Sequence, residues 1–250
     1  MLISPAQQIQ LPSKQAVLSD LREKIGRLDG AARRLARTVR ICDFIDDVLP
    51  THGLPLGCIH EIKGSPASVI AFSGLLSARI SQKGAILYIS PDRNLYPLGL
   101  LPYGINLKQW IHVCARRPED LVWTVLEALR CPQVNAVLAV LESADLTLCR
   151  RLQLAAESSG ATGFLLGNAA SATLASAITR WRITPIKAFP GQAFDEAAWN
   201  LQMTYCRGGR PDGWQVAWRN GELESLVAIP ETAARSAQRQ QLASGTAFVG

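Results

Sequence analysis

Residues 58–71 read CIHEIKGSPASVIA, which places a short apolar run directly before a helix. We predict a strand over residues 58–62, because this run is too short for a helix. The helix is expected to begin at Pro66, since serine at position 65 is a favoured N-cap residue and proline is favoured at the first helical position. A strand that turns at once into a helix is typical of the first βαβ unit of an α/β protein.

The turn between this strand and this helix stands where mononucleotide-binding proteins carry their phosphate loop. A Walker A loop, G-x-x-x-x-G-K-[ST], needs its lysine for the β- and γ-phosphates and its hydroxyl for magnesium. Counted from Gly64, the last three positions hold Val, Ile and Ala at residues 69–71. The pattern therefore predicts a degenerate phosphate loop, marked by Gly64, Ser65 and Ser68, with no nucleotide or other cofactor bound. One alternative stays open, in which backbone N–H groups of residues 64–68 and the neighbouring Lys63 hold a sulfate or phosphate.

Two acidic residues stand where an ATPase would carry catalytic acids. Asp92 follows the apolar run 85–90, the place of a water-activating acid, and Glu142 follows 135–141, the place of a Walker B acid. Without the loop lysine and hydroxyl these acids have no magnesium–phosphate complex to act on, and acids at strand ends also cap helices or face solvent. We interpret both as vestigial. Since G-x-S-x-G and H-E-x-x-H motifs are also absent, we expect no catalytic residue and no enzyme activity.

Short apolar runs alternate with helical patterns through the middle of the chain. The runs are 85–90, 111–115, 135–141 and 163–167, and the helical patterns are 66–82, 119–130 and 146–158. This alternation indicates βαβ units, and near-continuous apolar strands indicate a sheet covered on both faces. The runs 180–184, 199–206 and 214–219 are expected to be antiparallel strands, with a turn at 207–213. The predicted fold class is therefore α/β, a doubly wound and mainly parallel sheet extended by a C-terminal antiparallel hairpin.

Residues 14–49 are predicted to form an N-terminal helical arm, because apolar residues such as Leu21 and Ile25 recur there every three or four positions. The other face of the arm is cationic, with Arg33, Arg34, Arg37 and Arg40. Such a face is either simply solvated or docks against a partner or phosphate groups. From residue 230 the composition turns to Ala, Ser, Gln and Arg, which is typical of a weakly anchored tail. The expected division is an arm at 1–50, a core domain at 51–229 and a flexible tail at 230–250.

The composition of the 250 residues predicts a globular protein with a modest positive charge. Hydrophobic residues make up 48% and charged residues 18%, which excludes a largely disordered chain. The formal charge of +6 permits an anionic partner such as nucleic acid. Arginines close to the C-terminal tryptophans either contact nucleic acid or serve hairpin packing; they are Arg180, Arg182, Arg207 and Arg210.

Cysteine usage and hydropathy bear on metal binding and location. The six cysteines form no C-x-x-C motif and combine with the three histidines in no zinc-ligand spacing, so no metal site is expected. No apolar stretch is long enough to span a bilayer, and the first residues lack the features of a secretory signal. We therefore expect a cytoplasmic protein with reduced cysteines and no membrane partner.

Several segments in a fixed order resemble a known family. They are LYPLG at 95–99, EALRC at 127–131, LTLCRRLQLAAE at 146–157, TRWRI at 179–183 and CRGGRP at 206–211. Together with the strand order they resemble the ImuA family, RecA-like accessory proteins of bacterial translesion-synthesis cassettes, over residues 54–223. The resemblance implies a RecA-like core. RecA recombinases carry a Walker loop, and this chain departs from that pattern.

The resemblance also implies partners and a role. Proteins of this family are expected to act as non-enzymatic adaptors in damage-induced mutagenesis, bound to an ImuB-type polymerase-like protein and through it to an error-prone DnaE-type polymerase. By analogy with RecA-like filaments, the arm at 14–49 is the candidate contact with ImuB, RecA or a second copy of this chain, and DNA is a further candidate partner of the protein. Two alternatives remain, an ATP-binding recombinase-like ATPase that uses Asp92 and Glu142, and a division inhibitor similar to SulA.

Overall fold

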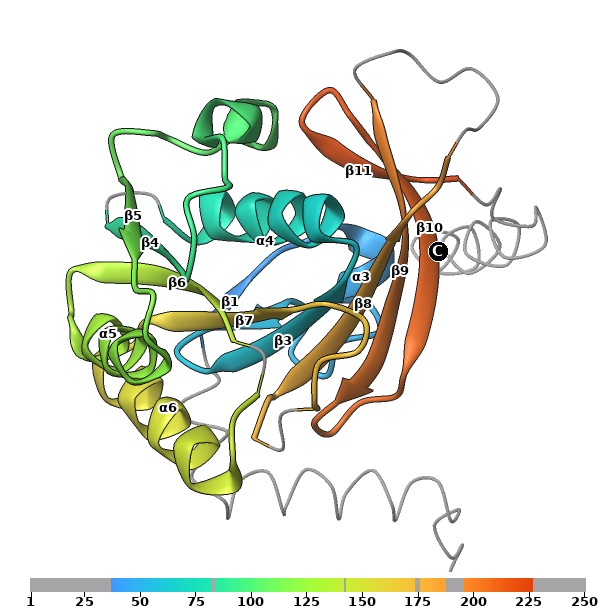
Figure 1. The fold of residues 1–250 in the computed structure, drawn as a ribbon. Coiled ribbons are helices and arrows are strands. Elements are labelled where there is room, and N and C mark those ends of the chain that lie inside the picture. Colours follow the sequence, from blue (N-terminus) through green and yellow to red (C-terminus); the bar gives the residue numbers. More distant parts are fainter. Residues whose placement is uncertain (1–36, 82–83, 142, 174–175, 188–195, 227–250) are drawn as a thin grey trace, which may run out of the picture.

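The computed structural model describes residues 37–81, 84–141, 143–173, 176–187 and 196–226. Nine of the strands in this part of the chain form one sheet. They are β3 (Ile59–Gly64), β4 (Ala85–Ser90), β5 (Trp110–Cys114), β6 (Val134–Val140), β7 (Thr162–Gly167), β8 (Thr179–Pro185), β9 (Ala197–Cys206), β10 (Asp212–Arg219) and β11 (Glu222–Ser225). Their order across the sheet is β11-β10-β9-β8-β3-β7-β6-β4-β5 (Figure 1).

The sheet has a parallel part and an antiparallel part that meet at β8. Strands β5, β4, β6, β7, β3 and β8 pair in parallel. Strands β8, β9, β10 and β11 pair in antiparallel fashion and form the other edge of the sheet. The first predicted strand thus lies inside the sheet, with parallel neighbours on both sides. This confirms an α/β fold with a large, mostly parallel sheet and an antiparallel extension, which is compatible with a RecA-like core.

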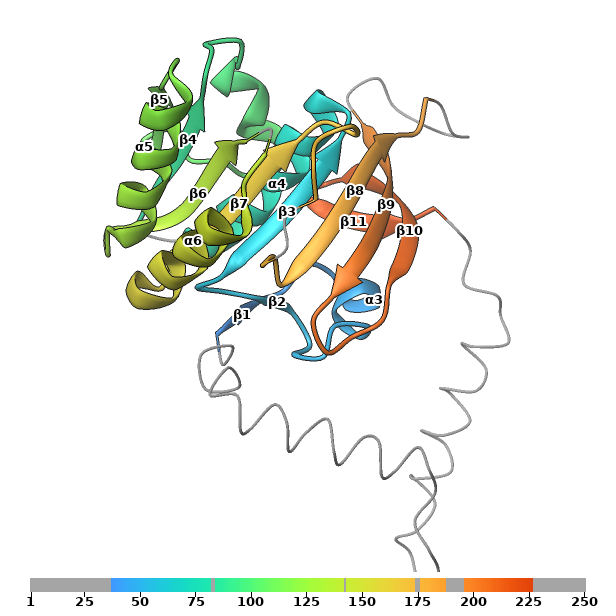
Figure 2. The ribbon, with the colours of Figure 1, turned by 60° about the horizontal axis from the view of Figure 1, so that its bottom comes forward.

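Helices cover the two faces of the parallel part. The helix α4 (Pro66–Ile80) and the 3-10 helix η1 (Pro97–Tyr103) lie on one face, and α5 (Pro118–Arg130) and α6 (Leu146–Ser159) lie on the other (Figures 1 and 2). One hydrophobic cluster lies beneath α4 and continues beneath the antiparallel strands, with Phe72 against Trp181 and Trp199. A second cluster lies beneath α5 and α6. Both faces of the parallel strands are therefore buried, as their apolar runs predicted.

Most predicted elements match the structure to within one or two residues at each end. Strand β11 has no counterpart in the prediction, because only Leu223 in it is apolar while Glu222 and Glu224 are exposed. The predicted turn at 207–213 is shorter in the structure, since β10 already begins at Asp212.

The last part of the predicted helical arm, residues 37–49, does not form the continuous helix that the spacing predicts. Residues 37–49 contain a two-residue strand, β1 (Thr38–Val39), which pairs with β2 (Leu54–Pro55), and a four-residue helix, α3 (Asp43–Asp46). The arm does not continue here as one helix, because its apolar residues turn into the core: Ile41, Ile45 and Leu49 are almost fully buried. Residues 14–36 of the predicted arm and the predicted tail at 230–250 lie outside the described residues.

A buried carboxylate holds this segment in place. The Asp46 carboxylate is almost fully buried and accepts the Ile41 N–H at 3.0 Å, which bends the chain between β1 and α3. Burial raises the pKa of Asp46, and the bond from Ile41 together with Arg40 opposes that rise.

Among the described helices, none is long and apolar enough to cross a membrane.

Candidate functional site

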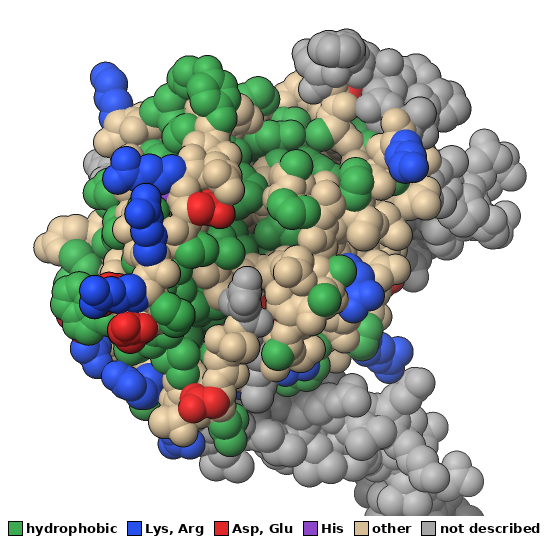
Figure 3. Space-filling view, viewed as in Figure 1, with side chains coloured by type: hydrophobic (Ala, Val, Ile, Leu, Met, Phe, Trp, Pro, Cys, Tyr) green, Lys and Arg blue, Asp and Glu red, His purple; other side chains and the backbone are tan. Residues whose placement is uncertain are grey.

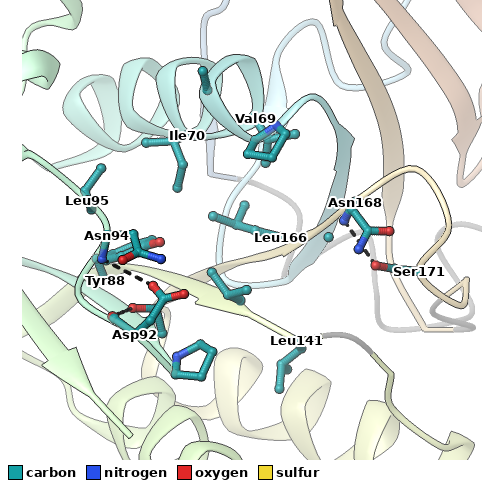
Figure 4. A pocket seen from close by; sticks show the side chains of 16 residues that line it. Val69, Ile70, Tyr88, Asp92, Asn94, Leu95, Leu141, Leu166, Asn168 and Ser171 are labelled. Carbon is teal, nitrogen blue, oxygen red and sulfur yellow. Dashed lines mark hydrogen bonds between the residues drawn. The ribbon is translucent and has the colours of Figure 1, made fainter. Parts of the chain in front are cut away.

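A cleft of about 600 Å³ lies where β3, β4, β6 and β7 end at their carboxyl ends. We call it the strand-end cleft. Hydrophobic side chains gather around a hollow on this face of the molecule (Figure 3). The apolar lining comprises Pro66, Ala67, Val69, Ile70, Tyr88, Pro91, Leu95, Val140, Leu141 and Leu166, and the polar lining comprises Ser90, Asp92, Asn94, Asn168 and Ser171 (Figure 4). In open α/β sheets this is the usual place for a ligand, because helices leave the strand ends toward opposite faces here.

The phosphate-loop position opens onto this cleft but is closed by the neighbouring strand. Strand β8 pairs with β3 as far as Gly64, and the Ser65 N–H donates to the Ile183 carbonyl at 3.1 Å. Gly64 has φ +141°, and a Cβ there would lie 1.8 Å from the Ile183 oxygen. A phosphate loop needs its N–H groups free, and the first of them is already bonded.

The start of α4 differs in one respect from the sequence prediction. Ser65 stands at the N-cap in an extended conformation, but its side chain makes no capping hydrogen bond. Pro66 has no N–H to be satisfied, and the Ser65 N–H is held by β8, so the strand pairing fixes where α4 begins although the hydroxyl does not cap the helix. Ser68 is buried in the first turn, and Val69 of the substituted Walker positions lines the cleft as an apolar wall.

The ammonium group of Lys63 is bonded to other groups of the protein. Its ammonium group donates to the carbonyl oxygens of Ser171 at 2.9 Å and Ala172 at 2.7 Å, and pairs with a Glu61 oxygen at 2.8 Å. An ammonium group has three protons, and these contacts use all three. Lys63 is therefore not available to an anion in this arrangement, whereas the part of that alternative that rests on backbone N–H groups stays a prediction. Lys63 instead holds the loop after β7 that forms one wall of the cleft.

Asp92 lies in the cleft, whereas the second predicted acid, Glu142, lies outside the described residues. One Asp92 carboxylate oxygen accepts the Asn94 N–H at 3.3 Å, and the Asp92 carbonyl accepts the Ser90 hydroxyl at 2.6 Å. The His112 Nε2 lies 3.0 Å from the same hydroxyl and can donate to it. Asp92 is the single charged side chain of the described lining, so the cleft carries no cation for a triphosphate.

Two amides complete the polar side of the cleft, and the sequence prediction missed both. The Asn168 side-chain oxygen accepts the Ala170 N–H at 2.8 Å, and the Asn168 N–H donates to the Ser171 hydroxyl at 3.0 Å. The Asn94 side-chain amide makes no hydrogen bond to a described residue. The available signal was that Asn168 directly follows an apolar run and that Asn94 lies in the loop after another, because the carboxyl ends of parallel strands converge at one edge of a sheet.

The described cleft residues do not form a catalytic constellation. Burial raises the pKa of Tyr88, so its phenol stays protonated. The described part of the chain also contains no group of three His, Cys, Asp or Glu side chains that could hold a metal ion. What the described lining offers is apolar surface with one carboxylate and two amides at its edge.

The residues predicted to contact a partner or nucleic acid divide among several elements. Leu21, Ile25, Arg33 and Arg34 lie outside the described residues. Arg37 and Arg40 are exposed beside β1, and Arg40 pairs with the carboxylates of Asp43 and Asp46. Arg207 and Arg210 are exposed in and after the tight turn that follows β9. Hence none of these four described arginines lines the cleft.

The remaining two predicted cations lie on one face of β8. Arg180 has its Nε 3.8 Å from a Glu61 oxygen and its guanidinium 4.5 Å above the ring of Tyr205. Arg182 is exposed two residues further along the strand. Glu61 thus contacts both Lys63 and Arg180, and this buried carboxylate ties β3 to β8 and to the loop after β7.

Comparison with known proteins gives two curated relatives. Both are called Protein ImuA and come from two strains of Caulobacter vibrioides, NA1000/CB15N and ATCC 19089/CB15. Each is 32% identical over 191 residues, covering 68% of this chain and 78% of the relative. No family model matches the chain.

Proposed function

The chain belongs to the ImuA family, and from this premise we propose that it is a RecA-like adaptor of mutagenic translesion synthesis that neither binds nor hydrolyses ATP. Membership of the family supports a role in the translesion-synthesis cassette. The order of the sheet supports a RecA-like core. The name shared by both relatives favours this role over inhibition of cell division.

One observation carries the non-enzymatic part of the proposal, the closure of the phosphate-loop position by β8. The Ser65 N–H is bonded to Ile183, and Lys63 is held by Glu61 and two carbonyl groups. In a nucleotide site the N–H groups of the loop would face the phosphates, and the position of the phosphate-binding lysine is occupied here by Ile70. A triphosphate would meet apolar side chains and the carboxylate of Asp92 in their place.

The partners follow from the same premise. We propose an ImuB-type polymerase-like protein as the direct partner and an error-prone DnaE-type polymerase as an indirect one, with RecA, DNA or a second copy as further contacts. The N-terminal arm remains the proposed contact with these partners, but its test must respect the core. Because Ile41 and Leu49 are buried, the deletion should remove residues 14–36 and spare 37–49.

Calorimetry with ATP and magnesium tests the absence of nucleotide binding. We expect no saturable heat beyond that of a magnesium-only titration. Saturable micromolar binding that Asp92→Asn weakens, and that Asp212→Asn retains, would instead establish the ATPase alternative. Asp212 is the matched control, because it is exposed like Asp92 and also accepts a nearby backbone N–H.

A further inference from the structure

The strand-end cleft continues into an exposed apolar segment. Leu95 lines the cleft, and the residues after it include Tyr96, Leu98 and Leu101, which are 68%, 48% and 50% exposed. These are three of the seven large hydrophobic side chains exposed in the described chain, and they fall within six residues. Clustered exposed apolar side chains mark interaction surfaces more often than scattered ones do. Figure 3 shows hydrophobic side chains on this side of the hollow.

The negative charge of Asp92 also limits which ligands the strand-end cleft can bind. Asp92 is the one charged residue in the described lining, and its second carboxylate oxygen has no hydrogen bond to a described residue. The free amide of Asn94 stands beside it (Figure 4). Arg93 is exposed and does not line the cleft. Such a site favours a cation with an apolar neighbour and disfavours a phosphate or carboxylate.

We propose that the strand-end cleft is a docking site for a linear segment of the polymerase-like partner, one that places an arginine or lysine at Asp92 and a large apolar side chain against Leu95 and Tyr96. The inference rests on the proposed function, since it names where that partner binds. A small molecule would fill the cleft but leave Tyr96, Leu98 and Leu101 exposed, whereas a peptide segment covers both. The cleft that holds a nucleotide in an ATPase would thus hold a peptide here.

Binding of the purified ImuB-type partner to cleft variants tests the proposal. Asp92→Lys and Tyr96→Ala should each weaken binding roughly tenfold, as truncation of a central contact does. The matched controls are Asp212→Lys for the charge and Trp123→Ala for the exposed aromatic ring, since Trp123 is 65% exposed on α5. Both controls should bind like the unmodified chain, and circular dichroism should show all four variants folded.

The outcomes separate the two proposals. If the unmodified chain binds the partner and the cleft variants bind equally well, the docking site is wrong and the adaptor role stands. Equal weakening by the two controls would also overturn the docking site, because the effect would then be one of general charge or hydrophobicity. If the folded chain does not bind the partner at all, both proposals fail.

Two peptides test the charge preference without the partner. The probes are acetyl-Leu-Arg-Phe-amide and acetyl-Leu-Glu-Phe-amide, added to isotope-labelled protein and followed by nuclear magnetic resonance. The arginine peptide should shift the signals of Asn94, Leu95 and Asn168, and the glutamate peptide should not. Equal shifts, or no shift with either peptide, would contradict the proposed chemistry of the cleft.

Discussion

At the scale of single residues, a buried histidine shows how the first strand is locked in place. His60 on β3 is fully buried and stacks on Phe164, with ring centroids 5.5 Å apart. Trp181 donates its Nε1–H to the Thr179 hydroxyl at 2.7 Å, so that hydroxyl donates its own proton to His60 Nδ1 at 2.7 Å. The His60 Nε2–H then donates to the Pro55 carbonyl at 2.9 Å. Every polar atom of the neutral ring is satisfied, and a proton on Nδ1 would force the Thr179 hydroxyl to turn its own proton away from the ring.

The neutral state of His60 predicts a loss of stability in mild acid. Burial lowers its pKa from 6.5 to about 4, so between these values the unfolded chain takes up a proton that the folded chain refuses. The free energy of unfolding should therefore fall as pH falls through this window, by up to about 3 kcal/mol. Urea unfolding of the protein and of His60→Gln, measured from pH 7 to pH 4, isolates this contribution. Parallel pH profiles for the two proteins would show that His60 is not the group responsible.

Gly64 is the residue on which closure of the phosphate-loop position depends. Its φ of +141° and the Ile183 oxygen, 1.8 Å from where a Cβ would lie, leave no room for a side chain. We expect Gly64→Ala to lower the free energy of unfolding by about 3 kcal/mol or more, because β8 must move away from β3. Gly99→Ala is the control, since its Cβ would meet only a Tyr96 ring carbon at 4.0 Å. Denaturant unfolding measures both, and equal small effects would mean that β8 tolerates displacement.

The sequence could predict part of this site and not the rest. The missing Walker lysine and hydroxyl are visible in residues 64–71, and Asp92 is visible as an acid after an apolar run. That Lys63 bonds to Ser171 and Ala172 was not predictable, because these residues are more than a hundred positions away. The hydrogen bond from the Ser65 N–H to the Ile183 carbonyl of β8 was not predictable for the same reason. Long-range pairing decides such groups, and periodicity reports only local structure.

At the scale of helices and strands, the prediction is correct where apolar runs alternate regularly with helical patterns, and it is wrong in the irregular segment 37–49. The strands β4 to β7 and the helices α5 and α6 follow directly from apolar runs and helical spacing, whereas η1 was not predicted. The segment 37–49 also shows helical spacing, but the structure divides it into β1 and α3. The spacing of Ile41, Ile45 and Leu49 reflects a shared buried side, which a short helix with flanking turns provides as well as a long helix does.

The burial of this segment predicts that it is part of the core. Leu49 is 1% exposed, so Leu49→Ala should lower the free energy of unfolding by about 2 to 5 kcal/mol. Leu154→Ala on α6 is the matched control, because Leu154 is 53% exposed and its truncation should change stability by less than about 0.5 kcal/mol. Thermal and urea unfolding measure both variants. If the Leu49→Ala protein were as stable as the control, residues 37–49 would have to be assigned to the arm and not to the core.

At the scale of the whole molecule, β8 joins the parallel and antiparallel parts into one continuous sheet. It pairs in parallel with β3 on one side and in antiparallel fashion with β9 on the other, and the cluster beneath α4 runs from Leu138 in the parallel part to Leu223 in β11. Glu61 adds a charged link, because it contacts Lys63 and Arg180 from a position 2% exposed. A domain boundary within this sheet would have to break all three connections.

This continuity predicts that the two parts of the sheet unfold together. Four of the six tryptophans lie in the antiparallel part, namely Trp181, Trp199, Trp214 and Trp218, so fluorescence reports mainly on that part, whereas far-ultraviolet circular dichroism reports mainly on α4, α5 and α6 over the parallel part. The urea transitions from the two signals should coincide, as they do for a single two-state domain. A fluorescence transition at clearly lower urea than the dichroism transition would mean that β8 to β11 open first. In that case the closure of the phosphate-loop position by β8 would be a local equilibrium, and nucleotide binding would have to be measured again under conditions that open it.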